Sequence, residues 1–207
     1  MTLDEWCARL RAVLAALVLL WAVPAAAQPA QRFEAAGHVV GASLPQFEGS
    51  DFGIGGRLAW HTDDVFSFEG ELTFFPGDYP DDGVAFSGKR IEGFFGVTAG
   101  VRFGILRPFA KFRAGFLDVR AAEQQFACTL IFPPSLSCML AAGKTLPAFD
   151  LGGGVEVNVT TRTFIRVEAG DRMLKYPGTV IDVEGVSHLE PFYGHSLRFA
   201  AGGGWRF

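Results

Sequence analysis

The feature that most constrains the fold is a two-residue alternation of side-chain polarity, which is clearest in residues 195–207. One parity of this segment carries Leu197, Phe199, Ala201, Gly203, Trp205 and Phe207, and the other carries Ser196, Arg198, Ala200, Gly202, Gly204 and Arg206. Successive side chains of a strand point to opposite faces of the sheet. The segment therefore predicts a strand with one apolar face and one polar or small face.

The same alternation recurs in seven earlier segments, which are residues 33–41, 51–60, 65–75, 91–103, 110–117, 149–159 and 163–173. Most are roughly as long as a tilted strand that crosses a membrane. Phe94 and Phe164 break the rule, because they fall on the polar parity. Long connections alternate with short ones, as in an outer-membrane barrel with periplasmic short turns. The pattern predicts an all-β fold, an eight-stranded antiparallel up-and-down transmembrane β-barrel.

The main alternative is a soluble eight-stranded barrel, which would fill its interior with apolar side chains. Hydrophobic residues make up 49% of the chain and charged residues 19%, and the predicted apolar face is rich in Phe. Aromatic residues also gather near the strand ends: Phe33, Trp60, Phe66, Phe103, Trp205 and Phe207 at one rim, and Phe52, Phe74 and Phe116 at the other. Two such girdles favour the membrane barrel, because aromatic rings prefer the membrane interface.

The first 27 residues have the pattern of a cleavable helical signal peptide. Arg9 and Arg11 precede an apolar run at 12–23, which is followed by Pro24 and three alanines at 25–27. The run is too short to span a bilayer as a helix, although a short N-terminal anchor is an alternative. We expect a signal peptide at 1–27 and one barrel domain at 28–207.

The polar parity of the predicted strands carries acids and bases in nearly equal number. These are Glu34, Arg57, Glu69, Glu71, Glu92, Arg102, Lys111, Arg113, Asp150, Glu156, Arg166, Glu168, Arg172, Arg198 and Arg206. A barrel of eight strands is just wide enough to be filled by side chains, and buried charges must be paired. We expect a closed lumen filled by a charge network, and the alternative is a gated polar pathway for ions.

The longest connection, residues 119–148, carries Cys128 and Cys138. Signal cleavage would remove Cys7, and export to an oxidising compartment then favours a disulfide between the remaining pair. The bond would close a ring of about ten residues and contribute somewhat under roughly 3 kcal/mol. Metal ligands or two free thiols are the alternatives, but no His or Cys neighbours complete a zinc set.

The same connection is unusually apolar, with Phe126, Leu130, Ile131, Phe132, Leu136, Met139 and Leu140. One hypothesis is an extracellular surface for a partner, a lipid or a hydrophobic solute. The favoured alternative is a loop that folds on itself around the disulfide or caps the barrel mouth.

No feature predicts nucleic-acid binding, a cofactor or catalysis. The net charge is −4 and the sequence shows no basic cluster. His195 and Ser196 near Glu190 suggest a lipid-modifying hydrolase, but adjacent strand residues point to opposite faces and would not hydrogen-bond readily. We therefore expect no enzymatic activity.

The final residues 203–207, Gly-Gly-Trp-Arg-Phe, look like the C-terminal strand signal of outer-membrane proteins. The chain from about residue 32 to 207 resembles the small outer-membrane β-barrel family related to the OmpA transmembrane domain and OmpX, and residues 149–172 resemble its late hairpin. The resemblance implies a Gram-negative outer membrane, contact with its lipid, and recognition of Trp205 and Phe207 by the barrel-assembly machinery. It leaves three hypotheses: a structural or surface-interaction barrel, a narrow porin-like channel for small or hydrophobic solutes as in OmpW-like barrels, and a lipid-modifying enzyme.

Overall fold

The computed structural model describes residues 32–44, 49–77, 89–121, 132–181 and 185–207. Residues 1–31 lie outside this range, so the signal peptide and its cleavage site stay predictions. The elements are β1 (Phe33–Leu44), β2 (Gly49–His61), β3 (Phe66–Phe75), β4 (Arg90–Gly100), β5 (Leu106–Val119), α2 (Leu136–Ala141), β6 (Lys144–Asn158), β7 (Thr163–Tyr176), β8 (Val180–Ile181), β9 (Ser187–His188) and β10 (Phe192–Arg206).

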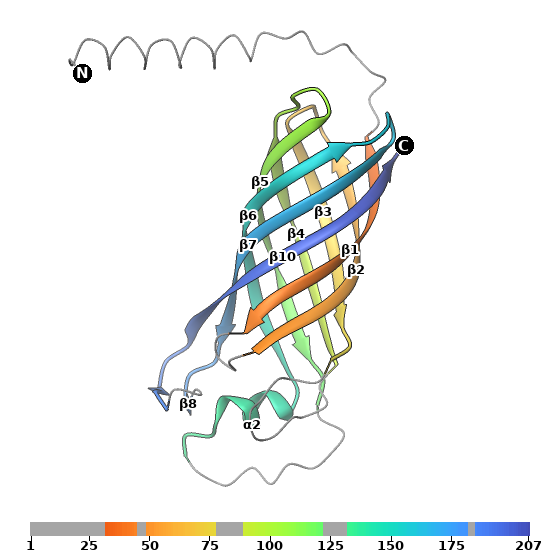
Figure 1. The fold of residues 1–207 in the computed structure, drawn as a ribbon. Helices are drawn as coiled ribbons and strands as arrows, with labels where there is room; N and C mark the ends of the chain where they lie inside the picture. Colours follow the sequence, from red (N-terminus) through yellow and green to blue (C-terminus); the bar gives the residue numbers. More distant parts are fainter. Residues whose placement is uncertain (1–31, 45–48, 78–88, 122–131, 182–184) are drawn as a thin grey trace, which may run out of the picture. The chain divides into compact units, whose positions relative to one another are not determined.

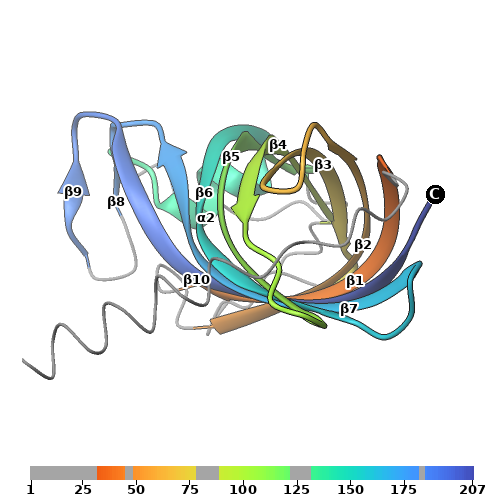
Figure 2. The same ribbon diagram turned by 90° about the horizontal axis from the view of Figure 1, so that it is seen from above.

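The eight long strands form a closed antiparallel barrel in the order β1-β10-β7-β6-β5-β4-β3-β2, and Figure 2 shows the ring from one end. Every long strand pairs with its neighbour in sequence, and β10 closes the ring by pairing with β1. The strands are strongly tilted (Figure 1). The expected fold, an eight-stranded up-and-down β-barrel, is confirmed.

The two ends of the barrel differ in the length of their connections. One end, here the terminal rim, holds Phe33, Phe207 and the short turns 62–65, 101–105 and 159–162. The other end, here the loop rim, holds the long connections. At the terminal rim the Asp63 carboxylate accepts hydrogen bonds from the backbone of Val65 and Phe66, at 2.8 and 2.7 Å. Short turns and long loops therefore alternate as expected.

Several strands are longer than their alternation predicted. β5 begins at Leu106 and β6 at Lys144, four and five residues before the expected segments 110–117 and 149–159. β4, in contrast, ends at Gly100, before the end of the expected segment 91–103. β7 continues to Tyr176. The extra rungs at the loop rim carry inward apolar side chains, so the inward face changes there from polar to apolar and the sequence alternation is lost. The helix α2 and the short pair β8–β9 lie in segments that were expected to be loops.

The barrel is apolar outside and charged inside. On the outer face, Phe52 is 73% and Phe95 65% exposed, whereas Arg113 and Asp150 on the inner face are 0% exposed. The aromatic residues expected at the two rims are all exposed, namely Phe33, Trp60, Phe66, Phe103, Trp205, Phe207, Phe52, Phe74 and Phe116. Within the described ranges, no helix has the length and apolarity needed to span a membrane.

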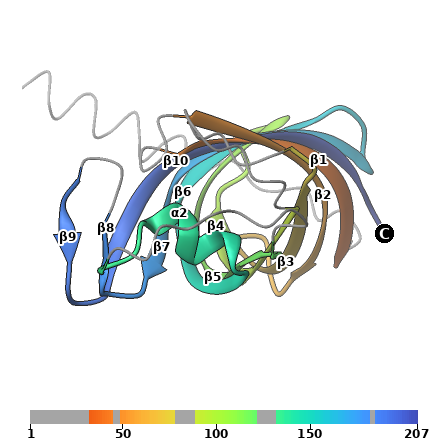
Figure 3. The same cartoon turned by 90° about the horizontal axis from the view of Figure 1, so that it is seen from below.

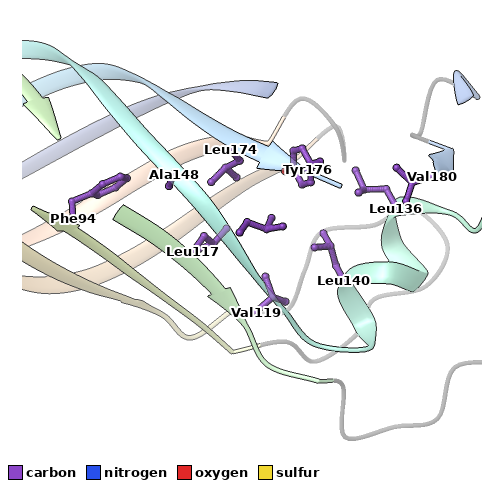
Figure 4. Packing of buried hydrophobic residues seen from close by; sticks show 10 residues of the cluster. Phe94, Leu117, Val119, Leu136, Leu140, Ala148, Leu174, Tyr176 and Val180 are labelled. Carbon is purple, nitrogen blue, oxygen red and sulfur yellow. The ribbon is translucent and has the colours of Figure 1, made fainter. Parts of the chain in front are cut away.

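A small apolar core lies at the loop rim beneath α2, which is seen across the end of the barrel in Figure 3. Ser135 caps the helix by accepting a hydrogen bond from the backbone of Cys138 at 3.3 Å. Leu136 and Leu140 are buried in the core (Figure 4), with Phe94, Leu117, Val119, Leu146, Ala148, Leu174, Tyr176 and Val180. The described part of the connection between β5 and β6, residues 132–143, thus folds back over the barrel end.

We call residues 132–143, which include α2, the cap. A second long connection, between β7 and β10, packs on the cap. The backbone N–H of Ile181 in β8 donates to the carbonyl of Pro134 at 2.9 Å, and Ile181 forms a parallel bridge with Ser135. Val180 adds its side chain to the core. The β5–β6 and β7–β10 connections are therefore joined by backbone hydrogen bonding as well as by apolar packing.

Candidate functional site

The barrel lumen is the candidate site, because it concentrates the buried charges of the described chain. The buried acids are Glu34, Asp51, Glu69, Glu71, Glu92, Asp150, Glu156 and Glu168, and the buried bases are Arg57, Arg90, Arg107, Lys111, Arg113, Arg166, Arg172, Arg198 and Arg206. Eight acids thus stand against nine bases. They share the lumen because strand alternation sends every second side chain inward.

Fourteen of the fifteen residues expected in the lumen network lie there. Arg102 does not, and the expectation for this residue is corrected: β4 ends at Gly100, so Arg102 falls in the following turn and is exposed. Three lumen charges were missed, namely Asp51, Arg90 and Arg107. Arg90 and Arg107 had been assigned to connections, and the signal that could have found them is the continuation of the alternation past the expected strand ends.

Arg113 lies at the centre of the network and contacts four carboxylates from three other strands. Its guanidinium lies 3.2 Å from Glu69, 2.7 Å from Glu71 and 3.0 Å from Glu168, and it also pairs with Asp150. A guanidinium has five N–H donors in a fixed planar arrangement, which suits it to several carboxylates at once.

Each of these carboxylates also has a second cation. Lys111 lies 2.8 Å from both Asp150 and Glu168. Arg166 lies 3.1 Å from Glu69, and Arg198 pairs with Glu71. The central charges therefore form one continuous network, which holds the inner faces of β3, β5, β6, β7 and β10 together.

A second group of ion pairs lies toward the terminal rim. Arg206 contacts Glu34 at 3.1 Å and Glu156 at 2.7 Å. Arg57 reaches Glu34 at 2.7 Å, and Arg107 reaches Glu156 at 3.2 Å. These contacts join β10 to β1 and β6, so the network also spans the closing seam of the barrel.

Near the loop rim the charges become fewer. Arg90 pairs with Asp51 at 2.7 Å, and Arg172 pairs with Glu92 at 2.8 Å. Beyond them lies the apolar core beneath α2, which is built from the inward residues of β4, β5, β6 and β7. The lumen therefore changes along its axis from ion pairs to apolar packing.

The two phenylalanines that break the alternation point into the lumen, together with Phe109, and serve as platforms for arginines. The guanidinium carbon of Arg206 lies 4.4 Å from the ring centre of Phe164. Arg166 lies 3.9 Å from the ring centre of Phe109, and Arg113 lies 5.4 Å from that of Phe94. Such stacking adds attraction to each buried cation.

Inward glycines make room for these rings. A Cβ on Gly154 would lie 2.8 Å from the Phe109 ring, and one on Gly204 would lie 2.5 Å from the Phe164 ring. Both distances are too short for a real side chain. The space beside Gly154 and Gly204 is therefore occupied by the rings of Phe109 and Phe164.

A small hollow of about 20 Å³ lies in the network, lined in part by His38, Arg57 and Glu71. This volume holds about one water molecule. His38 Nε2 lies 3.0 Å from the Thr73 hydroxyl and 3.6 Å from Glu71. The Nε of Arg57, one of the residues that line the hollow, has no hydrogen-bond partner among the described residues.

The histidine and serine considered for a hydrolase lie on opposite faces. His195 is exposed on the outer face, where its Nδ1 lies 2.6 Å from Asp171. Ser196 is buried in the lumen, where its hydroxyl accepts a hydrogen bond from Arg172 at 2.9 Å. Glu190 is an exposed residue of the β7–β10 connection. The structure does not bring these three together.

The cysteine pair is only partly within the described residues. Cys128 lies outside them, as do Phe126, Leu130 and Ile131, whereas Cys138 lies in α2. The disulfide between Cys128 and Cys138 stays a prediction. For the described part of this connection, Leu136 and Leu140 contribute to the cap, but Phe132 is 82% exposed.

The fold is similar to those of solved outer-membrane barrels. The match to the N-terminal β-barrel domain of Pseudomonas aeruginosa OprF covers 84% of this chain and 97% of the OprF chain, with 11% identity and a TM-score of 0.49. Neisserial surface protein A matches 86% and 98%, with 16% identity and a TM-score of 0.47. Ail of Yersinia pestis matches 85% and 97%, with 9% identity and a TM-score of 0.47. No protein-family model and no curated protein matches the chain.

Proposed function

We propose that this chain is a bacterial outer-membrane barrel with a closed, charge-filled lumen, and that it acts as a structural or surface-interaction protein without enzymatic activity. Its loop rim faces the outside of the cell, because outer-membrane barrels place short turns in the periplasm. The apolar outer face contacts membrane lipid. The closed barrel satisfies the backbone hydrogen bonding that a membrane demands, since it leaves no free strand edge.

The observation that carries the proposal is the inverted polarity of the barrel. Leu58 and Ile165 are more than half exposed, whereas Arg113, Asp150 and Glu156 are fully buried. In water, such a molecule would expose a continuous apolar wall far larger than the patches found on soluble proteins. In a bilayer the same wall is favourable, and the lumen charges neutralise one another.

Closure of the lumen is supported by its contents. The central carboxylates each contact at least two cations, so an ion passing through would have to separate several buried pairs. Removing one partner of a buried pair costs about 3–5 kcal/mol. The apolar core beneath α2 adds a second obstruction at the loop rim. Both features favour a rigid anchor over a narrow channel.

The surface for an external partner is proposed to lie on the cap. Phe132 in the β5–β6 connection is 82% exposed, and Leu189 in the β7–β10 connection is 72% exposed. The two connections are joined through Pro134 and Ile181. Apolar side chains on a firmly held loop suit protein contact, because little conformational entropy is lost on binding.

Planar-bilayer conductance of the refolded protein tests the proposal. A closed lumen predicts no discrete conductance steps in a preparation that shows heat-modifiable gel migration. Reproducible unitary steps would instead establish the channel alternative. Mass spectrometry of lipid A from cells with and without the protein tests the enzymatic alternative, and the proposal predicts identical spectra.

A further inference from the structure

One titratable side chain of the lumen stands apart from the arginine and lysine ion pairs. His38 lies on β1 with its side chain turned inward and only 8% exposed. Its Nε2 lies 3.0 Å from the Thr73 hydroxyl and 3.6 Å from Oε1 of Glu71. Histidine is the side chain whose charge ordinarily changes between about pH 5 and 8. His38 is therefore a point at which a proton could alter the charge of the lumen.

Two glycines beside His38 fix where its ring lies. His38 pairs with Gly55 of β2 on one side and with Gly202 of β10 on the other. A Cβ on Gly55 would lie 2.5 Å from the ring Nε2, and a Cβ on Gly202 would lie 2.8 Å from the His38 Cβ. No larger residue fits at either position without a shift of the neighbouring atoms. The ring therefore has a closely fitted place in the lumen, beside the hollow that it lines.

The contacts around the ring suit its neutral form. A neutral imidazole has one N–H donor and one acceptor nitrogen, and the hydroxyl of Thr73 can serve Nε2 in either role. In the described part of the chain, Glu71 is the one carboxylate within 4.0 Å of the ring. Both of its oxygens already contact guanidinium groups, since Oε1 pairs with Arg198 and Oε2 lies 2.7 Å from Arg113. A proton on His38 would add a third cation to this carboxylate.

The other charges that face His38 do not favour a positive ring either. Arg57 of β2 and both Arg166 and Glu168 of β7 line the same hollow. Glu168 is already bound by four cations. On β1 itself the nearest inward acid is Glu34, which Arg57 binds at 2.7 Å. Each acid around the ring is thus already paired, and burial makes an additional charge costly.

We propose that the lumen keeps His38 uncharged, and that a fall in the pH of the surroundings therefore weakens the barrel through this residue. In the unfolded chain, histidine takes up a proton below about pH 6.5. The folded lumen resists this proton, so the stability linked to His38 is complete above about pH 6.5 and is lost progressively as the pH falls below it. This property goes beyond the proposed anchoring role, because it makes the closed lumen sensitive to acid.

Urea unfolding of the refolded protein in lipid vesicles, at about pH 7.5 and about pH 5.5, tests the proposal. The measured quantity is the acid loss, which is the ratio of the folding equilibrium constant at the higher pH to that at the lower pH. The variant is His38→Gln, whose amide can keep the contact with Thr73 but does not titrate. The matched control is His195→Gln, the same change at a histidine whose side chain is 63% exposed on the outer face.

We expect the acid loss of the wild type to be about tenfold larger than that of His38→Gln, because one proton taken up only by the unfolded chain shifts the equilibrium by about that factor over this range. His195→Gln should show the wild-type acid loss or a slightly larger one, since an exposed ion pair such as the one with Asp171 contributes little. Equal acid losses for the wild type and His38→Gln would overturn the proposal. So would a smaller loss in the wild type, which would mean that a protonated His38 stabilises the lumen.

NMR of the wild-type protein with labelled histidine gives a second test that needs no folded His38 variant. The shifts of the ring nitrogens distinguish a neutral from a charged imidazole, and substitutions of the other histidines assign the His38 signal. A neutral ring at about pH 5.5 supports the proposal, and a charged ring overturns it. Heat-modifiable migration separates this proposal from the proposed function. A barrel that inserts but has a charged His38 contradicts only the role of this residue, whereas a chain that fails to insert contradicts the membrane barrel and the role of His38 with it.

Discussion

The backbones of Phe33 and Phe207 exchange two hydrogen bonds, of 3.1 Å from Phe33 to Phe207 and 3.0 Å in return. They extend the β1–β10 seam beyond its last strand rung, between Glu34 and Arg206. Both rings are exposed on the outer face, where the terminal rim meets the membrane interface. Phe33 and Phe207 thus each contribute to closure of the barrel through the backbone and to the aromatic girdle through the side chain.

Deletion of Phe207 should therefore impair assembly. The variant loses both hydrogen bonds between Phe33 and Phe207. It also loses the terminal aromatic residue of the segment 203–207, which resembles the C-terminal assembly signal of outer-membrane proteins. We expect reduced heat-modifiable protein in the outer-membrane fraction. Phe132→Ala is the control, because it removes an exposed ring from the cap and leaves the seam intact. Normal insertion of the deletion variant would contradict the role of the terminal strand.

Replacement of Arg113 by Met should destabilise the barrel strongly. The fully buried guanidinium contacts four carboxylates. Each of them keeps a second cation, so we expect a loss near the lower end of the range for breaking buried pairs, about 3 kcal/mol in the free energy of unfolding. Urea unfolding of the refolded protein in lipid vesicles measures this change.

Arg102→Met is the matched control for Arg113→Met. Arg102 is an exposed residue of the turn after β4, and such surface changes usually stay within about 0.5 kcal/mol. A loss for Arg113→Met no larger than that of Arg102→Met would show that the lumen network does not stabilise the barrel.

The barrel itself could be predicted because the polarity pattern of each strand can be recognised within that strand alone. Every strand must present one face to lipid and one to the lumen, so polarity repeats with a period of two. Even the exceptions carried information, since Phe94 and Phe164 fall on the inward parity and lie beneath arginines. The strand ends were predicted less well. Arg102 was expected in a strand but lies beyond the end of β4, and Arg107 was expected in a connection but lies in β5.

The cap could not be predicted in the same way, and neither could the pairing of Lys89 with Arg120, whose backbones are joined by a hydrogen bond of 3.1 Å. The residues of the pair are far apart in the sequence, and only the register of β4 against β5 makes them neighbours. The cap depends on Ile181 meeting Pro134 across two connections. Neither contact leaves a periodic trace, because each is set by tertiary pairing and not by strand alternation.

Phe164→Leu should weaken the terminal-rim group of charges. The ring lies 4.4 Å from the guanidinium carbon of Arg206 and 5.9 Å from that of Arg57. Leucine keeps the apolar contact but removes the attraction to these cations, which is worth about 1–2 kcal/mol for buried pairs. Urea unfolding measures the loss. Phe112→Leu, the same change on the outer face, should have a smaller effect.

Leu140→Ala should loosen the cap without opening the barrel wall. Leu140 is 0% exposed and packs in the core beneath α2. Loss of a buried leucine side chain costs about 2–5 kcal/mol at its site. Here we expect the cost to appear as local opening, because α2 is short and the strand hydrogen bonds are untouched.

Limited proteolysis of the inserted protein measures this opening. Cleavage within residues 132–143 should become faster by about tenfold or more in Leu140→Ala, since a 1.4 kcal/mol change already alters an opening equilibrium tenfold. Phe132→Ala, in the same segment but exposed, should be cleaved at the wild-type rate. The barrel should keep its heat-modifiable migration in both variants. Equal cleavage rates for Leu140→Ala and wild type would mean that Leu140 does not hold the cap in place.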